Sequence, residues 1–442
     1  MESLPGFRDF EPSVCAQRNG VFNGWRTVAR RFGFEEFDGP ILEPLELFTK
    51  KSGDEIVEQL FSFEDKGGRK IALRPEMTPS LVRILGKNLA TLKKPTKVFN
   101  ITEQFRYERP QKGRLRSFYQ FNVDIVGETS FAAEAELIAL AVESLRFFGL
   151  TEEHFYVRLS DRKLWQLWLR VFGVTDEACV GSVLGLLDKW ERRPQKDIEA
   201  DLAKILPSSV QTETFFDATE QLRQCKNPEA IECCFSQQTN DAELSEALHQ
   251  RLDEWGKLLH ELELLGCEPF VAVDLTIVRG LAYYTGFVFE VFERGNQGRA
   301  LAGGGRYDQL FEKLTSHPMS AVGFAAGDVT LTDLLNKYRL LQNYKREVDV
   351  FCVFEETERD RALRCAQMLR QENFSVLYPF GEAKVLSKQL KKAYAEQPRY
   401  IVIFTQELAP KGKVQVKCFA DKRTREVDWE EVAEVLRKDR QP

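Results

Sequence analysis

The chain has 442 residues, of which 43% are hydrophobic and 29% charged, and its formal net charge at pH 7 is −6. This length predicts two or three domains, and the composition is that of an ordinary globular chain. No stretch reaches the apolar length of a membrane span, and the negative net charge argues against bulk, non-specific binding of nucleic acid. We also expect no signal peptide, because the opening MESLPGFRDFEPS lacks a basic region followed by an apolar one.

The cysteines point to a reducing compartment. All nine are scattered, none forms a C-x-x-C pair, and none is spaced with the four histidines as zinc ligands are. We therefore expect free thiols, a cytoplasmic protein and no structural metal.

The first 160 residues mix helical and strand patterns. A helix is predicted over 14–31 and a strand over 36–42, where Pro40 and Pro44 are typical of an edge or interface strand. Helix and strand together could be a dimerisation element or ordinary structure. Further on, LRPEMTPSLVR (73–83) has the pattern of a strand-to-helix junction, where Glu76 and Thr78 could bind a substrate ammonium group. A helix cap alone would explain Thr78 but not Glu76.

The most informative stretch is FRYERPQKGRLRSFYQFNVDIVG (105–127), which predicts a long hairpin with a basic loop. Arg106 and Glu108 share one strand face, and the returning strand presents Phe118, Gln120, Asn122 and Asp124. Cations, an aromatic ring and carboxylates on one sheet face could hold a nucleotide, with a small polar ligand beside it. The alternative is a solvated hairpin with scattered charges.

The remaining chain changes character twice. Helical patterns dominate 161–265, and β patterns return over 266–340, where the three glycines of LAGGGRYD (301–308) suggest backbone in close contact with a ligand. After a short charged linker, strands alternate with helices over 347–442, which predicts a small α/β domain. Basic residues such as Lys388 and Lys391 on one of its helices are either a solvated face or contacts for nucleic-acid phosphates.

Several segments, taken in this order, resemble a class II aminoacyl-tRNA synthetase, and most closely histidyl-tRNA synthetase. They are LPGFRDF, FDGPILEP, LRPEMTPSLVR, FRYERPQKGRLRSFYQF, VRGLAYYTGFVFEVF and LAGGGRYDQL. The resemblance implies an α+β catalytic domain on a mainly antiparallel sheet (1–160 and 266–340), a helical insertion (161–265) and a C-terminal α/β anticodon-binding-like domain (347–442). It also implies a homodimer that uses histidine, ATP with Mg²⁺, and tRNA(His).

The resemblance further implies two steps: histidine and ATP give histidyl-adenylate and pyrophosphate, and the histidyl group then passes to the 3′ end of the tRNA. It assigns Arg106 and Arg279 to catalysis at the α-phosphate. The expected ATP contacts are Arg106, Glu108, Arg114 and Phe118. The expected histidine contacts are Glu76, Thr78, Gln120, Asp124, Arg279, Tyr283, Tyr284 and Tyr307. The expected contacts to the tRNA acceptor end are Arg109 and Gln111.

Several positions depart from the family pattern. The third motif ends in Gly-hydrophobic-Glu-Arg-Leu, whereas this chain reads GDVTL at 327–331, so Thr330 stands where an arginine grips ATP and Val329 stands in place of the glutamate. Asp124 replaces a glutamate, and Ala282 replaces an aspartate. Three interpretations follow: an active ligase with another cation in compensation, an inactive regulatory subunit of ATP phosphoribosyltransferase in histidine biosynthesis, or a synthetase for another amino acid. We favour the ligase, because the chain keeps Arg106, Arg279 and a tRNA-binding domain.

Overall fold

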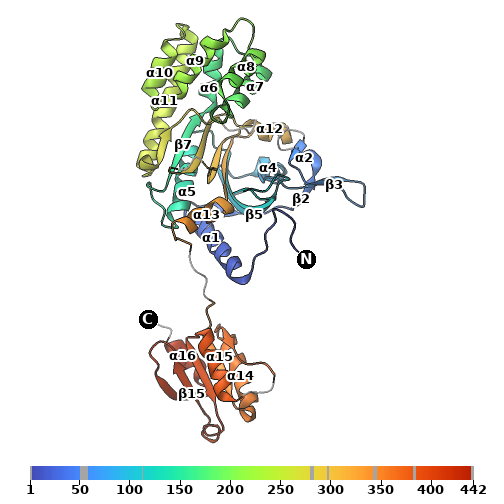
Figure 1. The fold of residues 1–442 in the computed structure, drawn as a ribbon, viewed down its shortest axis with the longest axis vertical. Helices are drawn as coiled ribbons and strands as arrows, with labels where there is room; N and C mark the ends of the chain where they lie inside the picture. The colour runs from blue at the N-terminus through green and yellow to red at the C-terminus, as the bar shows by residue number, and fades with distance from the viewer. Residues whose placement is uncertain are drawn as a thin grey trace. The chain divides into compact units, whose positions relative to one another are not determined.

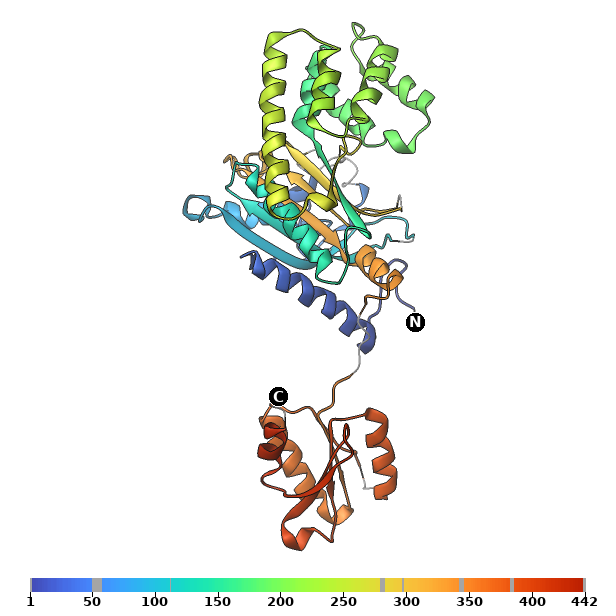
Figure 2. The same ribbon diagram turned by 90° about the vertical axis from the view of Figure 1, so that its left-hand side faces the viewer.

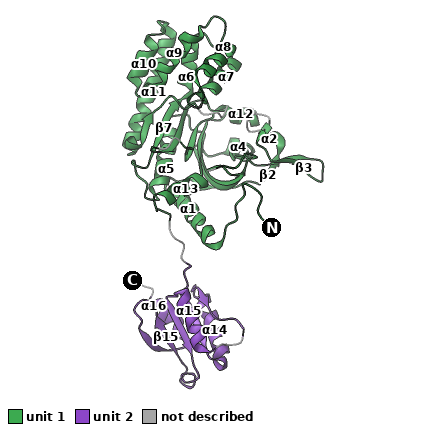
Figure 3. Ribbon diagram, viewed as in Figure 1, with its two compact units in different colours: residues 1–343 green, residues 344–442 purple. Residues whose placement is uncertain are grey.

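The computed structural model describes residues 2–49, 58–111, 113–278, 283–295, 298–341, 346–381 and 385–439. The chain forms two compact units, residues 1–343 and 344–442 (Figure 3). Arg279 lies outside the described residues, so its predicted role at the α-phosphate remains a prediction.

The first unit is built on an eight-stranded sheet, and its strands run in the order β1-β5-β6-β11-β10-β9-β7-β8. The five inner pairings are antiparallel, and only the edge strands β1 and β8 pair in parallel. The bounds are β1 Glu35–Glu36, β5 Thr96–Phe105, β6 Ser117–Val126, β7 Phe155–Asp161, β8 Val271–Val273, β9 Phe287–Glu293, β10 Ala302–Arg306 and β11 Ala321–Gly327. This architecture confirms the predicted mainly antiparallel α+β fold.

Two long helices cover one face of this sheet (Figure 2). α5 (Ala132–Arg146) packs against β6, β10 and β11, and α1 (Pro12–Arg31) packs against α5. Alternation along β6 sends Phe121, Val123 and Ile125 into this apolar core, where the ring of Trp25 stacks on that of Phe121 at 5.3 Å. Even-numbered β6 side chains therefore face the opposite side.

Smaller elements complete the rim of the sheet (Figure 1). A three-stranded sheet has the order β2-β4-β3. The bounds are β2 Leu42–Pro44, β3 Ser62–Glu64, β4 Lys70–Leu73, α2 Leu45–Thr49, α4 Thr78–Gly86, α12 Gln309–Thr315 and α13 Asp328–Lys337. The sequence predicts one strand over 36–42, and this prediction is wrong. The structure has two short strands there, β1 and β2, which belong to different sheets and are joined by a loop that contains Gly39 and Pro40.

Six α-helices follow β7 before the chain returns to the sheet at β8 (Figure 1). They are α6 Arg162–Val171, α7 Glu177–Leu187, α8 Gln195–Ile205, α9 Thr212–Arg223, α10 Pro228–Ser236 and α11 Ala242–Leu264. Asp161 caps α6 and also accepts hydrogen bonds from Arg251 and Trp255 of α11, so this buried carboxylate ties the helices to the end of β7.

The second unit has a five-stranded sheet in the order β13-β12-β14-β15-β16, and its described residues include three α-helices. The bounds are β12 Val350–Phe354, β13 Val376–Leu377, β14 Tyr400–Phe404, β15 Lys413–Cys418, β16 Thr424–Asp428, α14 Arg359–Gln371, α15 Leu386–Glu396 and α16 Val432–Lys438. Both β12 pairings are parallel, as βαβ units require, which confirms the predicted α/β fold. Lys388 and Lys391 are exposed on α15.

Candidate active site

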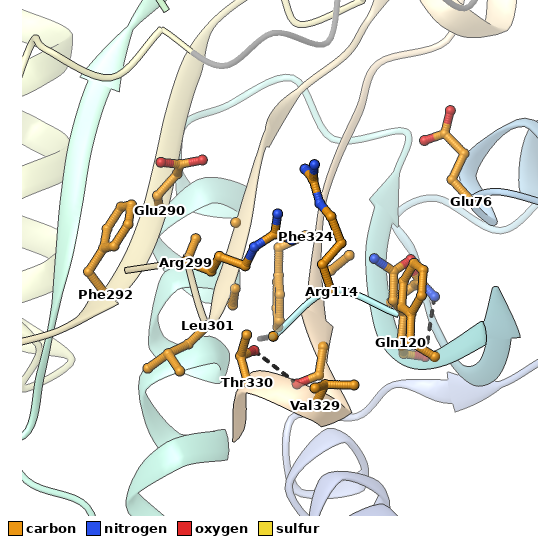
Figure 4. Close-up of a pocket in the computed structure, with 18 of the residues that line it drawn as sticks. Glu76, Arg114, Gln120, Glu290, Phe292, Arg299, Leu301, Phe324, Val329 and Thr330 are labelled. Carbon is orange, nitrogen blue, oxygen red and sulfur yellow. Dashed lines mark hydrogen bonds between the residues drawn. The ribbon is translucent and has the colours of Figure 1, made fainter. Parts of the chain in front are cut away.

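A cavity of about 1030 Å³ lies on the sheet face opposite α1 and α5 (Figure 4). Strands β6, β9, β10 and β11 form its floor, while the starts of α4 and α13 contribute to its wall. The cavity brings together most of the site residues expected from the sequence. They are Glu76, Thr78, Arg106, Glu108, Arg114, Phe118, Gln120, Asp124, Tyr283, Tyr284 and Tyr307.

Two buried carboxylates, each bound by a tyrosine, define one end of the cavity. The Tyr307 hydroxyl donates to Asp124 Oδ1 at 2.5 Å, and the Tyr283 hydroxyl donates to Glu76 Oε2 at 3.0 Å. Burial raises the pKa of Asp124 to about 7, with the Tyr307 hydrogen bond opposing the shift and the charge of Glu76 adding to it. Burial also raises the pKa of Glu76, against the nearby charge of Arg106 and the Tyr283 hydrogen bond.

Glycine at position 323 makes room for the Asp124 carboxylate. Asp124, Gly323 and Gly305 stand opposite one another across β6, β11 and β10. A Cβ atom on Gly323 would lie 2.0 Å from Asp124 Oδ1, far inside contact distance. The floor of the pocket is therefore shaped by a missing side chain as much as by those present.

Two of the three consecutive glycines of β10 lie against neighbouring strands, where we expected contact with a ligand. Gly303 lines the cavity, but a Cβ on Gly304 would meet the Gly323 carbonyl oxygen at 2.2 Å, and one on Gly305 would meet the Phe287 carbonyl oxygen at 2.7 Å. Gly304 and Gly305 thus allow neighbouring strands to approach closely. The sequence alone does not distinguish approach by a strand from approach by a ligand.

The other end of the cavity carries the charges expected to bind a nucleotide. Arg106 donates from Nε to the Pro75 carbonyl oxygen at 3.0 Å, and its guanidinium lies 5.3 Å from the centre of the Phe118 ring. Arg114 forms an ion pair with Glu108. In this structure the two residues assigned to opposite ends of ATP therefore neutralise each other, and nucleotide binding at both would require the pair to part.

Both residues expected to contact the tRNA acceptor end lie outside the cavity. Arg109 and Gln111 are exposed on the loop between β5 and β6, and Gln111 forms an isolated β-bridge with Arg114. A solvent-facing loop position is compatible with contact to a large substrate. At the other flank, Thr78 does not cap its helix: α4 begins at Thr78, and the capping position is Met77, without a side-chain hydrogen bond.

Sequence reasoning missed several lining residues, among them Glu290 on β9 and Arg299 in the connection from β9 to β10 (Figure 4). It also missed the role of Asp328, whose carboxylate accepts from Arg8 Nη2 and from the Tyr119 backbone N–H, both at 2.8 Å. The acidic residue at the start of α13 thus anchors the N-terminal segment and β6. A polar residue at a position that is hydrophobic in the family was the available signal.

Other classes of site find no support in the part of the chain that the structure describes. No group of three or more His, Cys, Asp or Glu side chains is placed to hold a metal ion there. Among the same residues, no helix combines the length and the apolar character needed to cross a bilayer. All nine cysteines are free thiols.

The chain matches a family model described as histidyl-tRNA synthetase over residues 6–330 and one described as anticodon binding domain over residues 347–439. The histidine–tRNA ligase of Opitutus terrae is 44% identical over 99% of this chain and 98% of its own length. The chloroplastic/mitochondrial histidine–tRNA ligase of Arabidopsis thaliana is 35% identical over 94% of this chain and 82% of its own length.

A solved structure gives the same fold. The crystal structure of histidyl-tRNA synthetase from Nostoc sp. superposes with a TM-score of 0.75 and covers 99% of each chain, at 22% sequence identity. At that identity the likeness concerns the fold alone.

Proposed function

The chain belongs to the histidyl-tRNA synthetase family, and we propose that it activates histidine with ATP and transfers the histidyl group to tRNA(His). It is an ATP-dependent aminoacyl-tRNA ligase. The structural support for this proposal is that one cavity joins a buried acidic end to an end that carries cations and an aromatic ring. The alternative of a regulatory subunit is not supported, since the curated relatives are ligases and the chain carries an anticodon-binding domain.

The acidic end suits histidine. In the proposed arrangement, Asp124 accepts a hydrogen bond from an imidazole N–H, with Gln120, Tyr284 and Tyr307 around the ring. The Tyr307 hydrogen bond fixes the Asp124 carboxylate, and a site built to accept a buried N–H discriminates against side chains that lack one. Glu76 and Thr78 bind the substrate ammonium, and Tyr283 holds Glu76 in place.

The cationic end suits ATP. We assign Arg106 and Arg279 to the α-phosphate, Arg114 to the γ-phosphate, Glu108 to the adenine amino group and Phe118 to stacking on the adenine ring. The histidine carboxylate is itself the nucleophile: it forms a bond to the α-phosphorus while the bond to pyrophosphate breaks. The protein therefore contributes positioning and charge stabilisation, and no general base is needed.

The residues present fit a Mg²⁺ ion that arrives with ATP. Such ions are held by one or two carboxylates together with substrate phosphates and water, and Glu290 is a carboxylate in the wall of this cavity. The ion would offset phosphate charge when bound.

Arg109 and Gln111 would meet the acceptor end of the tRNA, for which their exposed loop is suited. A homodimer is proposed from the family, supported by the exposed side chains of Ile41 and Leu42 beside Pro40. A cytoplasmic location is proposed from the free cysteines. The test of the function is histidine-dependent exchange between ATP and pyrophosphate, followed by charging of tRNA(His).

A further inference from the structure

The start of α13 brings no cation to the nucleotide end of the cavity. Thr330 lines the cavity in place of the arginine expected in the family's third motif, and its hydroxyl donates to the Gly327 carbonyl oxygen at 3.4 Å. Asp328 is committed to Arg8 and to the Tyr119 backbone. The triphosphate must find a counter-charge from another element of the fold.

Arg299 lies where that charge is missing. It enters the cavity from the connection between β9 and β10, far from Thr330 in sequence. A Cβ atom placed on Gly113 would be 3.4 Å from Arg299 Cδ and 3.9 Å from Thr330 Cγ2, so the stem of Arg299 and the methyl group of Thr330 flank the same point. Figure 4 shows the Arg299 side chain extending above Thr330, with its guanidinium in the same cavity as that of Arg114.

Every arginine or lysine in the described lining of the cavity has a partner within the protein, Arg299 included, so phosphate binding exchanges one partner for another. Arg114 is paired with Glu108, Lys337 is paired with Glu293, and Arg106 donates to the Pro75 carbonyl oxygen. What sets Arg299 apart is its position beside Thr330. A triphosphate with high negative charge gains most from a guanidinium fork, whose donors match phosphate oxygens in pairs.

We infer that Arg299 contacts the phosphate chain of ATP and supplies the charge that Thr330 lacks. This inference rests on the proposed function, since it concerns the nucleotide of that reaction. The two positions are linked by space as well as by charge. An arginine at position 330 would have to share the volume beside Gly113 with the stem of Arg299, whereas threonine leaves that volume open.

The first test measures nucleotide affinity of the full chain by equilibrium dialysis, with ATP and AMP as separate probes and no histidine present. Arg299→Ala should weaken ATP binding by about tenfold or more, because one charge-assisted contact is lost, and should change AMP binding by less than about twofold. Arg299→Lys should recover part of the loss. Arg170→Ala, which removes a half-exposed arginine from the helical region, should bind like the parent.

Unchanged ATP affinity in Arg299→Ala would overturn the inference. Equal weakening of ATP and AMP would also overturn it, because the contact would then be to the adenosine. The dialysis result decides the role of Arg299 whether or not pyrophosphate exchange occurs, whereas absence of exchange in the parent chain would count against the proposed function. The two failures are therefore distinct.

The second test exchanges the two side chains. Thr330→Arg alone should crowd Arg299 and weaken ATP binding, whereas Thr330→Arg combined with Arg299→Ala should bind ATP at least about tenfold more tightly than Arg299→Ala alone. A double variant no better than Arg299→Ala would overturn the claim that one position substitutes for the other. Thermal melts of all variants show that the comparison is made between folded proteins.

Discussion

The Tyr307 hydroxyl donates a hydrogen bond of 2.5 Å to the Asp124 carboxylate, and both side chains are almost completely buried, with 2% and 4% of their surface exposed. The two residues come from segments 183 positions apart and meet at the acidic end of the cavity. Because burial holds the pKa of Asp124 near 7, this carboxylate changes charge within the physiological range. Its protonation should therefore be visible in both stability and activity.

Asp124→Asn should change how stability depends on pH. The pKa of Asp124 rises from 3.8 to about 7 on folding, so its stabilising contribution is full below about pH 4 and is lost as pH rises to 7. Because asparagine does not ionise, the Asp124→Asn variant does not lose stability in this way as pH rises. Relative to the parent, its free energy of unfolding should therefore rise by about 2–3 kcal/mol between pH 5 and pH 7.5, measured by urea denaturation. Parallel pH profiles for the two proteins would contradict the shifted pKa.

Gly323→Ala should damage histidine binding through Asp124. The new methyl group would lie 2.0 Å from Asp124 Oδ1 and must displace it, because the Val123 carbonyl oxygen closes the same space at 2.9 Å. A displacement of that size should lower kcat/KM for histidine by about 10²-fold, while the ATP affinity changes little. Pyrophosphate-exchange kinetics with each substrate varied in turn make the measurement.

The matched control for that variant is Gly256→Ala in α11, where a Cβ atom meets nothing within 4 Å. This change should leave both kinetic constants intact and stabilise the chain by up to about 1 kcal/mol through helix propensity. If Gly323→Ala retained the parent kcat/KM for histidine, the placement of Asp124 beside Gly323 would be wrong.

Arg8 and Asp328 should be energetically coupled. Arg8→Ala leaves the buried Asp328 carboxylate with fewer partners, which should cost about 1–3 kcal/mol of stability. The cost stays below that of breaking a fully buried pair because Arg8 is partly exposed. Asp328→Asn in the Arg8→Ala background should cost less than in the parent, so a double-mutant cycle in urea reveals the coupling. Arg26→Ala, which breaks the half-exposed pair with Glu36, should cost about 0.5 kcal/mol or less. An equal cost for Arg8→Ala and Arg26→Ala would show that the Arg8–Asp328 pair stabilises the chain no more than a partly exposed pair does.

Local pattern was enough to predict much of the site. The alternation of 118–126 placed Phe118, Gln120 and Asp124 on one face of a strand, and the structure has all three on the cavity side of β6. The fold class followed from the resemblance and from the order of helical and strand segments. Strand neighbours did not follow, because β6 pairs with β11, about 200 positions away, and periodicity carries no information about such partners.

The residues that were missed are those whose role depends on which tertiary neighbours the folded chain brings beside them. Arg299 comes directly after a polar turn, where its sequence neighbourhood resembles any exposed loop. In the folded chain its stem lies beside Gly113 and Thr330, and its side chain lines the cavity. From the sequence, Gly304 resembles a glycine that contacts a ligand. The structure instead places the Gly323 carbonyl oxygen against it. Both depend on tertiary neighbours that a single sequence does not identify.

The most direct measurement is ATP–pyrophosphate exchange by the purified full chain, with and without histidine. The account predicts exchange that rises with histidine to saturation and that falls by about 10²–10³-fold in Arg106→Ala, because a preorganised charge at the α-phosphate is lost. Arg170→Ala should exchange like the parent chain. No exchange above background at saturating histidine would contradict the assignment of this cavity to histidine activation.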